Sequence, residues 1–171
     1  YTFTFSENTA LSANVTLPDY VKSAIFEAPD AAVQIDFKGY TLTTKGDVSI
    51  SEEVFLVNSA STNGKLISTK KTDITDYAIG LWEEIEGVNL SATNGTLMLV
   101  GAENAAKTVN ADITAKNIIV RDTWEVNGTI TNSGIHNIGT LICNTLTQTK
   151  ANQTNLEANS VLIVKKKADL Y

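Results

Sequence analysis

The chain has 171 residues, 43% of them hydrophobic, and a formal net charge of −6. This length suits one domain with a buried core rather than two separate domains. The acidic balance argues against a nucleic-acid partner, because only residues 165–167 form a run of lysines. No apolar run of about 18 residues occurs, so we expect no membrane insertion.

The β-branched residues dominate the composition. There are 23 Thr, 15 Ile and 13 Val, and their restricted χ1 angles favour strands. The 16 Asn and 10 Gly favour turns between those strands. The sequence therefore predicts a single all-β domain. The lone Cys143 cannot form an internal disulfide, and the lone His136 argues against sites built on several histidines.

Residues 1–32 are predicted to form an N-terminal strand and a short cap. Tyr1, Phe3 and Phe5 alternate with threonine, as in a strand. Residues 19–26 follow Pro18 and predict a helix. Such a helix would shield the open end of a sheet from edge-to-edge pairing.

The middle of the chain predicts further strands. Residues 33–43 read as two strands about Gly39, and residues 48–50, 54–57 and 66–67 continue the series. Residues 74–85 predict a longer excursion with a helical turn, because Trp82 and the glutamates after it lack strand alternation.

Short apolar runs recur at a nearly constant spacing in the second half. One series begins at Leu97, Ile118, Leu141 and Val161, and the other comprises Leu66, Leu90, Ile113, Ile135 and Leu156. The spacing predicts a right-handed parallel β-solenoid over residues 33–164, with rungs of about 20–23 residues and each series stacked as an inward ladder.

Gly128 and Gly139 precede strand starts, where a coil corner is expected to need positive φ. Residues 165–171 are left as a C-terminal tail. A β-sandwich is the alternative fold, because Asn-Gly is also a hairpin signal.

Two segments resemble a known family. The phrase IDFKGYTL at residues 35–42 resembles the opening rung of pectin-lyase-like parallel β-helices of bacterial surface proteins. The phrase VNGTITNSG at residues 126–134 is similar to repeats of autotransporter passengers and adhesins. The resemblance implies a β-helix and an extracellular or cell-surface location, and it implies no activity.

Aromatic and charged residues supply candidate binding groups. Trp82, Trp124 and Tyr40 offer flat faces to sugar rings, with Trp124 expected to be the more exposed tryptophan, and Arg121 is the fourth candidate ligand residue. The alternative is that each aromatic fills the core or caps a loop.

Acidic residues supply a candidate Ca²⁺ site, the only cofactor the sequence suggests. The carboxylates are Asp73, Asp76, Glu83 and Glu84, with Glu86 nearby. The alternative is a charged loop surface, since the alternating Asp/Asn/Gly pattern of a calcium loop is missing.

No catalytic set emerges from the sequence, so we expect a protein that is not an enzyme. Arg121 is the only arginine, and it adjoins Asp122 about half a coil from Asp112. The first hypothesis is an extracellular structural or adhesive module that binds a surface glycan or protein. The second is a self-associating filament or pilus-like subunit that donates the strand of Tyr1, Phe3 and Phe5 to a neighbour. A polysaccharide lyase or hydrolase is the third.

Overall fold

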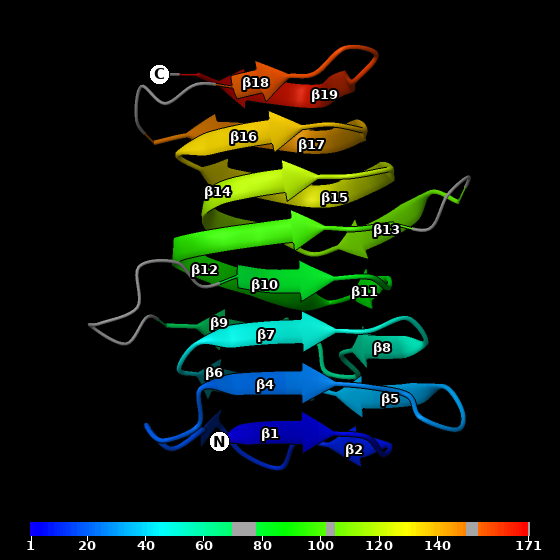
Figure 1. Cartoon of the computed structure of the whole chain (residues 1–171), viewed down its shortest axis with the longest axis vertical. Helices are drawn as coiled ribbons and strands as arrows, with labels where there is room; N and C mark the ends of the chain where they lie inside the picture. The colour runs from blue at the N-terminus through cyan, green and yellow to red at the C-terminus, as the bar shows by residue number, and fades with distance from the viewer. Residues whose placement is uncertain (70–77, 102–104, 150–153, 171) are drawn as a thin grey trace.

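The protein is a β-solenoid of about seven stacked turns (Figure 1). The structure is a computed structural model that describes residues 1–69, 78–101, 105–149 and 154–170. Within these residues it contains strands and no helix, and the strand pairs that build the coils are parallel. The fold class predicted from the sequence is confirmed, and the β-sandwich alternative is wrong.

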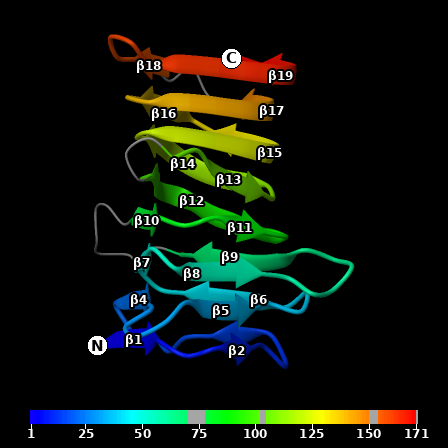
Figure 2. The same cartoon turned by 90° about the vertical axis from the view of Figure 1, so that its right-hand side faces the viewer.

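Three sheets, which we name faces A, B and C, run along the stack (Figure 2). Face A contains β1 (Thr2–Phe5), β4 (Ser23–Phe26), β7 (Asp47–Ile50), β10 (Ala78–Leu81), the second halves of β12 (Val88–Leu99) and β14 (Ile113–Val120), β16 (Gly134–Asn137) and β18 (Thr154–Leu156).

Face B contains β2 (Thr9–Ala10), β5 (Val33–Asp36), β8 (Val54–Val57), β11 (Ile85–Glu86), β13 (Lys107–Asn110) and the first halves of β15 (Thr123–Asn132), β17 (Thr140–Gln148) and β19 (Val161–Asp169). Face C contains β3 (Val15–Thr16), β6 (Thr41–Thr44), β9 (Gly64–Ser68), the first halves of β12 and β14, and the second halves of β15, β17 and β19.

Alternation along each strand builds the core. On β7, Val48 and Ile50 point inward and are buried, whereas Ser49 between them faces outward. Parallel pairing then places like residues over one another, so Leu42, Leu66 and Leu90 form one buried ladder on face C. The core is therefore a column of aliphatic ladders along the solenoid axis.

The predicted ladders are correct where they begin and wrong farther along the chain. Leu97 pairs with Ile118, as predicted, but Ile118 pairs with Ile135 rather than with Leu141. Leu141 lies on face B.

The second series fails at the corresponding point. Leu66, Leu90 and Ile113 stack as predicted, and the next member is Ile130 rather than Ile135. Leu156 and Val161 are 53% and 42% exposed because they lie in the last described coil, which is covered on one side only.

A shortening of the coil explains these errors. Paired residues on face A are 21 positions apart at Leu97 and Ile118, but 17 apart at Asn117 and Gly134. The strands of the later coils continue around corners through a local register shift instead of ending in a separate turn. Each later coil therefore contains fewer residues. A repeat of about 22 residues, as predicted from the sequence, no longer matches the residues that pair between these coils.

Both predicted terminal segments belong to the solenoid. The helix predicted over residues 19–26 is wrong, because Ser23–Phe26 form β4, with Ala24 and Phe26 inward and parallel partners on both sides. Residues 1–32 thus supply the first coil and part of the second instead of a cap. Residues 165–169, predicted as part of a tail, continue β19.

The other strand predictions agree with the structure. Strands occur at each expected position between residues 33 and 68. Within the excursion predicted for residues 74–85, Ala78–Leu81 form β10 instead of a helical turn, and residues 74–77 lie outside the described residues. No described helix is long and apolar enough to cross a membrane.

Asparagine and glycine act at the corners, where strand pairing leaves backbone groups without a ladder partner. The side-chain amide oxygens of Asn8, Asn14 and Asn89 accept backbone N–H groups from the next coil at 2.7–3.0 Å. Gly128 and Gly139 are needed for close approach instead of the predicted positive φ: an added Cβ would lie 2.2 and 2.0 Å from carbonyl oxygens of the preceding coil.

The ladder positions predict which substitutions destabilise the protein more. Ile118→Ala should lower the free energy of unfolding by roughly 2–4 kcal/mol, because it leaves a cavity between two coils. Arg121→Ala, at an exposed corner, should change it by less than about 0.5 kcal/mol. Denaturant midpoints measure both values, and the reverse order would contradict the inward assignment.

Candidate functional site

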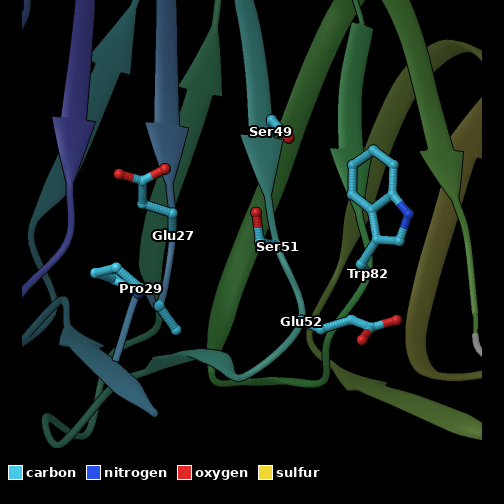
Figure 3. A pocket seen from close by; sticks show the side chains of 7 residues that line it. Glu27, Pro29, Ser49, Ser51, Glu52 and Trp82 are labelled. Carbon is cyan, nitrogen blue, oxygen red and sulfur yellow. The ribbon is translucent and has the colours of Figure 1, made fainter. Parts of the chain in front are cut away.

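A pocket of about 480 Å³ opens on the outside of the solenoid, at the corner where face A turns into face B. Its lining residues come from three successive coils: Glu27, Ala28, Pro29, Ser49, Ser51, Glu52 and Trp82. Except for Ser49 on β7, each follows the end of β4, β7 or β10. In Figure 3, Ser49 and Ser51 lie between Glu27 on one side and Trp82 on the other.

The position of Trp82 is set by a glycine on the neighbouring strand. Gly80 occupies the outward position of β10, between Ser49 and Met98 of the adjacent strands. A Cβ added to Gly80 would lie 2.4 Å from Cζ3 of Trp82, so the indole ring rests against bare backbone. Trp82 is therefore half-buried and held in place while still lining the pocket.

The polar lining follows from strand alternation and from the shared corner. Ser49 and Ser51 face outward because Val48 and Ile50 point into the core. The charged residues in the lining are Glu27 and Glu52, both acidic. The pocket thus combines one aromatic face, two hydroxyl groups and two carboxylates.

Glu83, next to Trp82, links neighbouring coils at the corner that forms the pocket. Its carboxylate accepts hydrogen bonds from Lys107 Nζ at 2.6 Å and from the backbone N–H groups of Glu84 and Glu53 at 2.9 and 3.2 Å. These donors lie in three successive coils, so Glu83 fixes the turn that carries Glu52 relative to the one that carries Trp82.

The ion pair of Glu83 and Lys107 is mostly buried, with 8% and 17% of the two side chains exposed. Burial by itself would raise the pKa of Glu83, but the hydrogen bonds from Lys107, Glu84 and Glu53 and the Lys107 charge lower it below its ordinary value of 4.5. Glu83 is therefore a charged structural anchor.

Of the four predicted ligand residues, Trp82 alone lines the pocket. The expectation that Trp124 is exposed is wrong, since its side chain is fully buried. Asp122 completes the corner with a φ of 57°, so β15 begins at Thr123. The side chain that follows, Trp124, therefore points inward. Tyr40 packs against the core, and Arg121 is exposed at the corner between β14 and β15.

The predicted Ca²⁺ site is not assembled in the described part of the chain. Asp73 and Asp76 lie outside the described residues. Glu83 is committed to Lys107, while Glu84 is exposed. Among the described residues, no group of three or more His, Cys, Asp and Glu side chains is arranged to hold a metal ion.

The predicted donor strand is already paired within its own chain. β1 lies parallel to β4, and the ring of Phe5 stacks on Phe26 with centroids 4.5 Å apart. Phe3 and Tyr1 are 42% and 86% exposed. Tyr1 contacts Tyr20 edge to face, with ring centroids 5.4 Å apart.

Sequence reasoning missed Glu27, Ser49, Ser51 and Glu52. A signal existed, since Glu27 and Glu52 follow equivalent strands and are 25 positions apart. It was hidden because the next coil is longer: Val48 and Ile79, paired on face A, are 31 positions apart. No fixed period relates Trp82 to the two glutamates.

Comparisons with protein-family models, with curated proteins and with solved structures yield no significant match to this chain.

Removing the Glu83 anchor should destabilise the fold. Lys107→Met leaves a buried carboxylate without its cation and should cost about 3 kcal/mol of unfolding free energy. Lys45→Met is the control, because its ion pair with Asp19 is 3.9 Å long, more exposed than that of Lys107, and worth less than about 0.5 kcal/mol. Chemical denaturation at neutral pH compares the two variants, and equal losses would contradict the anchoring role.

The same anchor predicts a pH dependence. Because its folded-state pKa lies below 4.5, charged Glu83 contributes stability that is complete above about pH 4.5 and is lost as the pH falls through the folded-state pKa. Glu83→Gln should therefore show a flatter acid limb in thermal melts. Asp36, whose pKa is lowered by hydrogen bonds from Ser59 and Lys38 that outweigh its desolvation, should retain some pH dependence in that variant.

Proposed function

We propose that the protein is a non-catalytic, extracellular adhesive module of a microbial surface protein, and that its corner pocket binds a surface glycan. The observation that carries the proposal is one pocket lined by the Trp82 ring together with Ser49, Ser51, Glu52 and Glu27. An aromatic face packs against the apolar side of a sugar ring, and carboxylates and hydroxyls accept or donate hydrogen bonds to its hydroxyl groups.

The solenoid supports this role because it holds the pocket at a corner that directly follows paired strands. Ser49 lies on a strand paired on both sides, and Trp82 is held by Gly80 and by the Glu83 anchor. A site that is already ordered loses little conformational entropy when it binds. The family resemblance noted above supports the surface location.

Several observations favour binding over catalysis. Asp112 accepts a hydrogen bond from the Thr129 N–H, and His136 pairs with Glu157 near the end of the stack, so both side chains are engaged in contacts within the solenoid. Burial raises the pKa of Cys143 to about 11, which keeps its thiol protonated.

Two substitutions test the site on a glycan array. Trp82→Ala removes the stacking face, and Gly80→Ala pushes the ring away without altering any lining residue. Each should reduce retention of the bound sugars at least about tenfold, as loss of 1.4 kcal/mol would. Phe55→Ala, which removes a partly exposed aromatic from face B, is the control and should bind normally.

The result that would contradict the proposal is turnover. Two assays on a polysaccharide panel detect it: the release of reducing ends and the appearance of absorbance from unsaturated uronate. Either signal would favour the lyase or hydrolase hypothesis. If both Trp82→Ala and Gly80→Ala retained the sugars as well as the unmodified protein does, the assignment of glycan binding to this pocket would be wrong.

A second candidate function is self-association of the solenoid ends. Apolar side chains are exposed on the last described coil, at Leu156 and Ile163, and on the first, at Phe3. Each of these coils pairs with a neighbouring coil on one side. Parallel pairing of one copy on the next would cover these edges and build a filament.

Light scattering of the 171-residue chain across a concentration series tests self-association. The filament hypothesis expects a mass that grows with concentration and that falls to the monomer value in Ile163→Lys. The matched control Ile67→Lys lies on β9 in the middle of the stack, and it should not change the association. A monomer at all concentrations would contradict this candidate.

A further inference from the structure

We infer that the corner pocket selects a sugar that carries a protonated amine, of the glucosamine type, over neutral or acidic sugars. This inference rests on the proposed function and specifies its ligand class. It is drawn from the signs and positions of the groups around Trp82.

The charge of the lining has one sign. Glu27 and Glu52 come from different coils and both line the pocket, and the other lining residues are uncharged. Lys107 approaches this corner from the neighbouring coil, but its Nζ lies 2.6 Å from Glu83, a pairing that neutralises it. The pocket therefore presents a net negative potential to a ligand.

The aromatic face strengthens a preference for cations. A cation over a tryptophan face is attracted by the negative potential of the ring, and tryptophan is the best side chain for this contact. In Figure 3 Glu52 lies on the side of the Trp82 backbone rather than against the ring face, with Ser51 between Glu52 and Ser49. A sugar that spans the pocket can thus place an ammonium group near a lining carboxylate while its body lies over the serines and the Trp82 ring.

The same groups disfavour the alternatives. A uronate would bring a carboxylate next to Glu27 and Glu52, and like charges repel most where water is partly excluded. An N-acetylated sugar keeps the stacking surface but has no positive charge to offset the desolvation of the two glutamates. A glycan with free amines satisfies both the ring and the carboxylates.

Titration calorimetry with three sugar oligomers of equal length tests the inference in mildly acidic, low-salt buffer. The probes are oligomers of glucosamine, of N-acetylglucosamine and of galacturonate. We expect the glucosamine oligomer to bind at least about tenfold more tightly than the acetylated one, and to weaken as salt is added. The galacturonate oligomer should show the weakest binding.

Paired variants locate the effect. Glu27→Gln and Glu52→Gln should each weaken glucosamine binding about fivefold and leave N-acetylglucosamine binding unchanged. Glu157→Gln removes the same charge from the turn between β18 and β19, outside the pocket, and should have no effect. Circular dichroism should show that all three variants are folded.

The outcomes separate the inference from the proposed function. Equal binding of both glucosamine forms, abolished by Trp82→Ala, would overturn the amine preference and leave the glycan site standing. No binding of any sugar would overturn the glycan site itself. Binding of an oligolysine peptide at Trp82 without binding of the glucosamine oligomer would assign the pocket to a basic protein segment and overturn the sugar assignment.

Discussion

Parallel hydrogen bonding between successive coils is the constraint on which the rest of the structure depends. Each strand has its register fixed by the strand of the preceding coil, as between β4 and β7, where four consecutive residues pair in order. Alternation then decides which side chains enter the core and which face outward. A residue's environment is therefore set by its coil position more than by its sequence neighbours.

The corners of the coils are less constrained by strand pairing than the faces, and the candidate binding pocket lies at one of them. Strand pairing determines the faces closely, but a corner can lengthen or shorten without breaking the ladders, as the 17- and 31-position offsets on face A show. The pocket uses this freedom: Glu27, Glu52 and Trp82 lie at one corner of three coils of different length. Glu83 then locks the corner by bonding across coils.

The proposed function follows from combining a rigid ladder with one aromatic side chain outside it. Burying Trp124 contributes to core packing, whereas Trp82, which Gly80 accommodates on the outer surface, keeps part of its ring available. The two tryptophans thus have opposite roles although a glutamate follows each of them in the sequence. A preference for amines would arise from the lining charge, which Glu27 and Glu52 determine.

The sequence by itself determined the all-β class, the solenoid and most strand positions, because alternation and β-branched composition are local properties that each strand carries within itself. It also paired Leu66, Leu90 and Ile113 correctly, where the coil length stays near its mean. Only the tertiary structure decided the later ladder partners, the strand at residues 23–26 and the inward turn of Trp124. The pocket belongs to this second group, because residues 25 and 30 positions apart become neighbours through corner lengths, which no periodicity encodes.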